Sequence, residues 1–191
     1  MDRRKALRNI GTGIGAIAVT PTIVSLFQSC QTAATYSPSF IPRDDFNIIS
    51  NLMELIIPKT DIPGAIELKL PEFTDAYIDA VWDIKQKESF VIAWKEFLAA
   101  SIKSAAKEKP SQLTIAEWDD QLAKYLKPGN EISPDEKGAS EFAFQLRNLT
   151  VNAFKTNEFI GENIMAYAPI PGEQKGCVDL METTGGKAWS L

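Results

Sequence analysis

Apolar residues recur three or four positions apart in five segments of this chain. Such spacing places one apolar stripe along a helix, so each segment is expected to form an amphipathic helix. No stretch alternates apolar and polar residues long enough to predict a strand. The chain is therefore predicted to be all-α, a single compact helical domain of about five helices. The five segments cover residues 43–57, 71–84, 87–107, 114–127 and 133–153.

Residues that start or stop helices mark several of the segment ends. Pro58 follows the first apolar stripe and cannot continue that helix. Thr114 and Glu117 have the spacing of a capping box, and Ser133 followed by Pro134 is typical of a helix start. We therefore expect the fourth helix to begin near residue 114 and the fifth near residue 133.

Two sets of side chains stand out on the predicted helix faces. Asp75, Asp79 and Asp83 are four residues apart and share one face, away from the apolar stripe, which predicts a solvated row rather than a cation site. Trp94 and Trp118 lie on apolar stripes, so we expect them in the core rather than in a ligand cage.

The charge distribution limits the partners that the protein can bind. The 191 residues carry a net charge of −5, yet the first thirty hold four basic side chains and one acidic side chain. The remainder is therefore more acidic than the whole, and nucleic-acid phosphates would repel it. We expect no nucleic-acid partner.

Histidine is absent, and the only cysteines are Cys30 and Cys177. These counts exclude a c-type haem attachment, a zinc site built from Cys and His, and a histidine general base. The glycine-rich string at residues 11–16 follows no strand, and the S-x-x-K string at residues 104–107 lacks its companion motifs. We predict no catalytic, cofactor or metal site, so the chain is not expected to be an enzyme by itself.

Residues 1–30 have the organisation of an export signal, with a basic start and an apolar middle. Arg3 and Arg4, with Leu7 and Arg8 after them, resemble a twin-arginine signal, which directs folded proteins across the membrane. We therefore expect a periplasmic protein that engages the twin-arginine export machinery.

The end of the signal leaves alternatives open. Cys30 follows a small residue, as in a lipoprotein, but cleavage after Ala34 also fits, and an uncleaved anchor over residues 10–27 is a third reading. Lipidation at Cys30 would make the protein membrane-anchored. In both processing schemes Cys177 has no cysteine partner in its own chain, which suggests a bond to another chain or burial.

The mature chain divides into three parts. Residues 31–42 read as a tether, residues 43–166 as the helical domain, and residues 167–191 as an irregular Pro- and Gly-rich tail. Its apolar residues Tyr167, Ile170, Leu180 and Trp189 do not suit a solvated tail, so we expect it to lie over a surface, its own or a partner's.

The string at residues 55–65 and the Tyr-x-Pro-Ile-Pro-Gly-x-x-x-Gly-Cys tail together resemble the gluconate 2-dehydrogenase subunit 3 family. The resemblance covers nearly the whole mature chain, although residues 67–71 differ from the shorter, glycine-richer link expected there. It implies a non-catalytic small subunit of a periplasmic dehydrogenase for sugars, sugar acids or polyols. The large subunit would be of the glucose-methanol-choline type and carry FAD, and electrons would pass to a cytochrome c subunit or another acceptor.

The resemblance also implies that this subunit escorts the large subunit through export and stabilises it. Partner-binding residues are then expected in the loop and the tail: Pro58, Thr60, Asp61, Pro63, Gly64, Tyr167, Pro169, Pro171, Gly172, Gly176, Cys177 and Trp189. The alternative is a free-standing exported helical lipoprotein that binds a small ligand.

Overall fold

A computed structural model describes residues 36–127, 129, 132–168, 172 and 176–190. Its contacts divide the chain into residues 1–37 and a larger unit from Pro38 to Leu191. The predicted signal residues Arg3, Arg4, Leu7, Arg8 and Cys30 lie outside the described residues. None of the helices that the structure describes combines the length and the apolar character needed to span a membrane.

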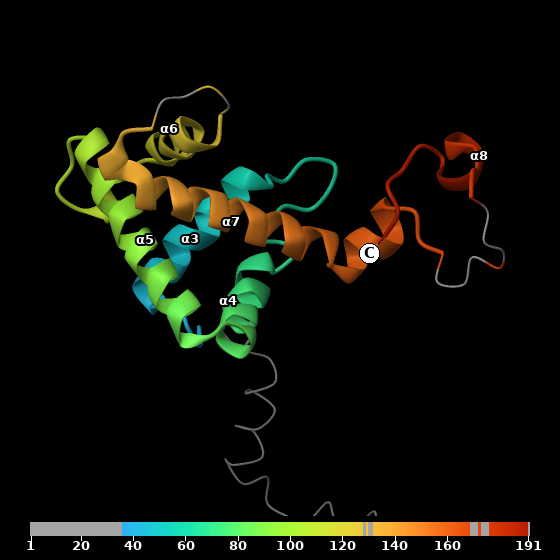
Figure 1. The fold of residues 1–191 in the computed structure, drawn as a ribbon, viewed down its shortest axis with the longest axis horizontal. Helices are drawn as coiled ribbons and strands as arrows, with labels where there is room; N and C mark the ends of the chain where they lie inside the picture. Colours follow the sequence, from blue (N-terminus) through green and yellow to red (C-terminus); the bar gives the residue numbers. More distant parts are fainter. Residues whose placement is uncertain (1–35, 128, 130–131, 169–171, 173–175, 191) are drawn as a thin grey trace, which may run out of the picture. The chain divides into compact units, whose positions relative to one another are not determined.

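The larger unit is helical, as predicted, and the described residues contain no β-strand (Figure 1). The five expected helices are all present. They are α3 (Arg43–Ile56), α4 (Leu70–Val81), α5 (Ile84–Ser104), α6 (Ile115–Leu126) and α7 (Lys137–Lys155).

Shorter helical turns connect and extend these helices. Pro110–Gln112 and Pro134–Glu136 are 3₁₀ turns that precede α6 and α7, and Ile160–Ile164 is a single π-helical turn. The tail is irregular over much of its described length, but it contains α8 (Leu180–Thr184), which was not among the expected helices.

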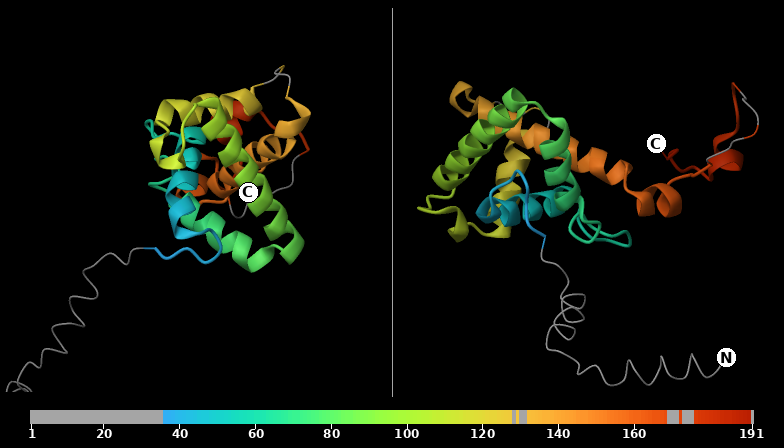
Figure 2. Two further views of the ribbon diagram at one scale, coloured as in Figure 1. Left: turned by 90° about the vertical axis from the view of Figure 1, so that its left-hand side faces the viewer. Right: turned by 90° about the horizontal axis from the view of Figure 1, so that it is seen from below.

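Helix α7 lies at the centre of the helical body, the name used here for helices α3 to α7 and the links between them. It packs against α3, α4, α5 and α6, and it crosses the other helices in the views of Figures 1 and 2. Phe97 of α5 and Phe142 of α7 are fully buried, with ring centroids 5.0 Å apart. Trp94 and Trp118 are 4% and 6% exposed and pack beside these rings, which confirms that they belong to the core.

Side-chain caps fix the starts of α5 and α6. Thr114 and Glu117 form the predicted capping box, with the Glu117 N–H donating to Thr114 Oγ1 and the Thr114 N–H donating to Glu117 Oε2. Asp83 and Gln86 form a second box, so α5 begins at Ile84, three residues before the expected position. Ser133 does not cap α7, because the 3₁₀ turn intervenes.

Asp75 corrects the expectation of a solvated aspartate row. Its carboxylate is fully buried and accepts hydrogen bonds from the backbone N–H groups of Ser39 (2.6 Å), Phe40 (3.1 Å) and Ile41 (2.7 Å). The sequence could not show this, because the donors lie at least 34 positions away. Ile41 is buried, so the end of the predicted tether belongs to the folded domain.

The other two aspartates of the predicted row are exposed, but both have partners. Asp79 accepts from Lys87 at 3.0 Å, and Asp83 caps α5.

Candidate partner-binding surface

The loop between α3 and α4 is organised by Glu54, near the C-terminal end of α3. The Lys59 N–H donates to Glu54 Oε1 at 3.1 Å, and the Ile66 N–H donates to Glu54 Oε2 at 2.8 Å. The Ala65 N–H also donates to the Ile57 carbonyl at 3.0 Å, which closes the base of the loop. One carboxylate therefore binds both sides of the loop and holds it against the helix that precedes it.

Gly64 is required by the close approach of these groups. A Cβ at this position would lie 2.2 Å from Glu54 Oε1 and 2.7 Å from the backbone nitrogen of Lys59. A backbone atom cannot move aside as a side chain can, so any larger residue would displace the loop.

The loop presents only part of the predicted binding set to solvent. Pro58, Thr60 and Asp61 are exposed, Pro63 is half-buried, and Gly64 is buried. The Thr60 N–H donates to the Ile62 carbonyl at 3.0 Å, and this tight turn makes the exposed tip of the loop.

The α3–α4 loop also carries one exposed ion pair. Lys59 and Glu67 are 2.7 Å apart, and the hydrogen bond to Glu67 raises the pKa of the Lys59 amine. Because both side chains are largely exposed, the pair contributes little to stability.

The C-terminal segment, residues 159–190, folds back on itself. The Ala166 N–H donates to the Ala188 carbonyl at 2.8 Å, and the Ser190 N–H donates to the Ala166 carbonyl at 2.9 Å. These bonds form a parallel bridge between Ala166 and Trp189. The segment that leaves after α7 is thereby joined to the end of the chain.

Helix α8 lies inside this closed segment and has clear end signals. Asp179 accepts from the N–H groups of Met181 and Glu182, and Gly185 adopts a left-handed conformation (φ 63°) that ends the helix. Glycine reaches this conformation at little cost, so the sequence itself specifies where α8 stops.

Large apolar side chains of the C-terminal segment remain exposed, although the helical body buries most of its own. Trp189 is 47% exposed and Met181 is 67% exposed. Among the described residues, the main hydrophobic cluster of the body contains no side chain beyond Phe154, although Ile160 is buried at the start of the C-terminal segment. The exposed set, here called the apolar tail surface, comprises Phe159, Tyr167, Val178, Leu180, Met181 and Trp189.

The structure places the predicted tail residues unevenly. The bridge brings Trp189 beside Ala166 and so near Tyr167, which follows it in the chain. Gly172 and Gly176 are exposed, whereas Pro169 and Pro171 lie outside the described residues. The residues predicted to bind a partner did not include Phe159, Val178, Leu180 and Met181. The apolar residues of the Pro- and Gly-rich tail were the signal that could have added the last three of these.

Cys177 is exposed and has no disulfide partner in the described residues. Burial within its own chain, one of the two interpretations of this thiol, is therefore excluded. The described residues also contain no cluster of three or more Cys, Asp or Glu side chains that could hold a metal ion.

Asn157 lies between the end of α7 and the C-terminal segment. The side-chain amide of Asn157 donates to the Leu68 carbonyl at 3.4 Å, so the turn that follows α7 contacts the residues just before α4. Asn157 also accepts from the Ile160 N–H at 3.4 Å. One side chain thus connects Leu68, which follows the predicted loop, with Ile160, which precedes the predicted tail.

Comparison with known proteins identifies one family. The family model of gluconate 2-dehydrogenase subunit 3 matches residues 43–172, a region that contains all five long helices and the loop but ends before α8. No curated protein and no solved structure showed significant similarity to this chain. The matched region is well over half of the sequence, and the chain belongs to the gluconate 2-dehydrogenase subunit 3 family.

Proposed function

We propose that this chain is a non-catalytic subunit that binds and escorts a large flavin-dependent dehydrogenase subunit. The family assigns the chain to a dehydrogenase complex of the gluconate 2-dehydrogenase type. The apolar tail surface is the observation that supports a docking role. Six large apolar side chains, each at least 45% exposed, lie in one short segment in which Ile160 is the only fully buried large apolar side chain among the described residues.

The large subunit would cover this surface in the complex. Burial of exposed Trp, Met and Leu side chains drives association, and aromatic residues are enriched at the centres of protein interfaces. The exposed tip of the α3–α4 loop, with Thr60 and Asp61, would provide further polar contacts. FAD would be held by the large subunit, and a cytochrome c subunit is a further candidate member of the complex.

The export signal gives this subunit its second role. Twin-arginine export carries folded proteins. One signal on the small subunit would therefore suffice for a preassembled pair. Exposed apolar surface would be covered before the pair crosses the membrane, which protects both chains from aggregation.

The export role is tested in the native host with the double variant Arg3→Lys, Arg4→Lys. We expect both this chain and the flavoprotein to remain in the cytoplasm, with flavin-dependent dehydrogenase activity lost from the periplasm and retained in the cell extract. Lys5→Arg is the matched control, because it changes a basic residue of the same segment without touching the arginine pair. Normal export of the flavoprotein beside the double variant would contradict the escort role.

The complex itself is tested by purification through a tag on the full chain. We expect a large chain with a flavin absorbance spectrum to be recovered at equal stoichiometry. Recovery of the small chain alone from cells that contain the active dehydrogenase would contradict the proposed partnership.

A further inference from the structure

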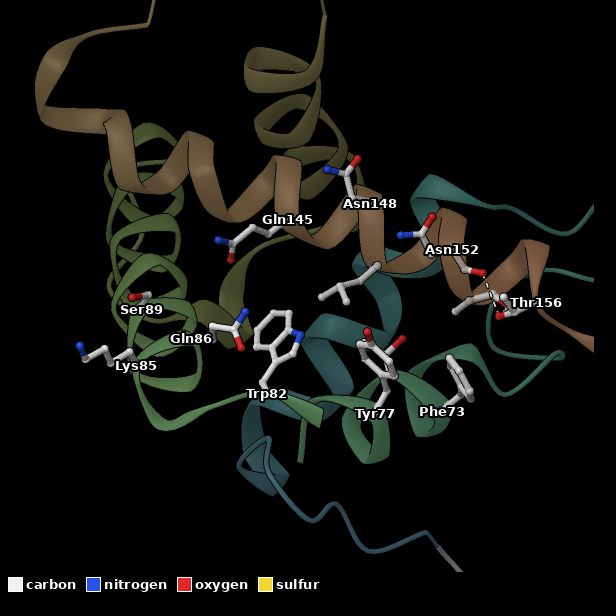
Figure 3. Close-up of a pocket in the computed structure, with 13 residues that line it drawn as sticks. Phe73, Tyr77, Trp82, Lys85, Gln86, Ser89, Gln145, Asn148, Asn152 and Thr156 are labelled. Carbon is white, nitrogen blue, oxygen red and sulfur yellow. Dashed lines mark hydrogen bonds between the residues drawn. The ribbon is translucent and has the colours of Figure 1, made fainter. Parts of the chain in front are cut away.

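A cleft of about 680 Å³ lies on the helical body (Figure 3), and no residue of the apolar tail surface lines it. Its walls come from α4, the first turns of α5, and α7. This volume is in the range of small-molecule binding sites in proteins. The family match and the proposed escort role assign nothing to it.

One wall of the cleft is a row of uncharged polar side chains on α7. Gln145, Asn148, Asn152 and Thr156 are three or four residues apart and so share one helix face, as Figure 3 shows. Each amide offers two donors and two acceptors. Gln86 on α5 faces them, and because its carbonyl accepts from the Asp83 N–H, its NH₂ group is what it can offer a ligand.

The other wall presents aromatic rings. Phe73 and Tyr77 of α4 stack with centroids 6.1 Å apart, and they are 51% and 40% exposed. Trp82 follows α4, and its ring packs edge-on against Phe90 at 5.6 Å, which fixes its orientation. Flat apolar faces therefore lie opposite a row of amides (Figure 3).

Two residues that line the cleft each have a buried polar atom without a hydrogen-bond partner. These atoms are Thr74 Oγ1, whose residue is 2% exposed, and Gln145 Oε1. Among the described residues only one other buried side-chain atom, Trp94 Nε1, is in this condition. Buried polar groups are normally paired, because an unpaired one costs about 1–3 kcal/mol. Both atoms therefore lie just behind the lining of the cleft with unused hydrogen-bonding capacity.

The charge of the cleft selects among ligands. No carboxylate lines it, and Lys85 supplies one cationic group. The lining therefore offers no anionic partner to a cationic ligand, and it is compatible with a neutral or singly anionic one. The remaining lining is amide, hydroxyl and aromatic.

We propose that this cleft binds a sugar or a sugar acid of monosaccharide to disaccharide size. Neighbouring hydroxyl groups both donate and accept, which matches the amide row, and the C–H face of a sugar ring matches the aromatic wall. In a sugar acid, Lys85 would pair with the carboxylate. The proposal does not rest on the escort role, since the cleft and the apolar tail surface share no residue.

The direct test is a titration of the full chain followed by NMR of the side-chain NH₂ groups. D-Glucose and sodium gluconate are the probes, and sodium acetate is a carboxylate without hydroxyls. We expect saturable shifts of the Gln145, Asn148 and Asn152 signals, with a Kd of about 1 mM or lower for at least one sugar. Shifts that do not saturate, that lie elsewhere, or that acetate reproduces would overturn the proposal.

Variants separate the two ligand classes. Asn148→Ala and Asn152→Ala replace exposed side chains, and each should weaken sugar binding by about tenfold. Lys85→Gln should weaken gluconate binding and leave glucose binding unchanged. Asn51→Ala, an exposed asparagine on α3 outside the cleft, is the matched control. Equal binding by the cleft variants and the control would also overturn the proposal.

Discussion

The helical body and the C-terminal segment use apolar side chains in opposite ways. In the body, α3 to α7 bury them around Phe97 and Phe142, and backbone donors satisfy the buried carboxylate of Asp75. In the segment after α7, Leu180, Met181 and others remain in solvent, and the fold depends on a backbone bridge and helix caps. Burial stabilises the body, whereas the tail is held by a few hydrogen bonds that contribute much less.

This contrast separates the residues that determine the stability of the fold from those available to bind a partner. Side chains that already have partners inside the chain are needed for the fold, and side chains exposed on a segment outside the core are available to another protein. Substitutions in the body should therefore change the free energy of unfolding, and substitutions in the tail should change assembly.

The largest expected loss is at Asp75. Asp75→Ala removes the acceptor of three backbone N–H groups, one of them fully buried, and should lower the free energy of unfolding by about 3 to 4 kcal/mol. Urea denaturation of the full chain measures it. Asp79→Ala, one helical turn away and exposed, should change it by less than about 0.5 kcal/mol. Equal effects of the two substitutions would refute the structural role of Asp75.

A smaller loss is expected at Gly64. Gly64→Ala places a Cβ against Glu54 and the Lys59 backbone, so the α3–α4 loop must shift, at a cost of about 2 kcal/mol. Gly176→Ala is the control, because nothing lies within 4 Å of its added Cβ. Denaturation of both variants checks this, and a neutral Gly64→Ala would show that the loop is not closely packed.

A feature of the fold could be predicted from the sequence where the residues that form it lie close together along the chain. The five helices were predictable because their stripes and caps are local, and even the missed start of α5 had a local signal in Asp83 and Gln86. Asp75 was not predictable, because its partners are brought to it only by the tertiary fold.

Some features of the candidate site also had local sequence signals, whereas others form only in the tertiary fold. Apolar residues in a Pro- and Gly-rich tail predicted a surface for binding, and Asp179 and Gly185 were local signals for α8. The bridge between Ala166 and Trp189 joins residues far apart in the chain, so no local pattern could show it. The cleft likewise forms only when α7 lies against α4 and α5.

Tyr125 gives the body a dependence on alkaline pH. Burial of its ring raises the pKa of the phenol to about 12, and the negative charge of Glu136 acts in the same direction. The folded state therefore keeps a proton that the unfolded state loses above its ordinary pKa of about 10. This stability is fully present below about pH 10 and is lost as the pH rises toward 12, by about 1 kcal/mol at about pH 11.

Denaturation at increasing pH checks this, with Tyr125→Phe as the reference. The variant cannot ionise at this position, so its stability should show a weaker alkaline decline than that of the natural chain. The same decline in both proteins would assign the pH dependence to other groups.

The smallest change in stability, and the largest change in assembly, is expected in the tail. Leu180→Ser with Met181→Ser alters two side chains that are 59% and 67% exposed, so the free energy of unfolding should change by less than about 0.5 kcal/mol. Ile115→Ser is the matched control, because Ile115 is also 67% exposed but lies on α6 of the body. Purification from the native host through a tag measures the yield of the flavoprotein with each variant.

The tail variant should recover at least about tenfold less flavoprotein than the control, since each buried apolar side chain contributes about 1.5 kcal/mol or more to binding. Equal recovery would mean that the partner does not cover the apolar tail surface, and the contrast between the two regions would then concern folding alone.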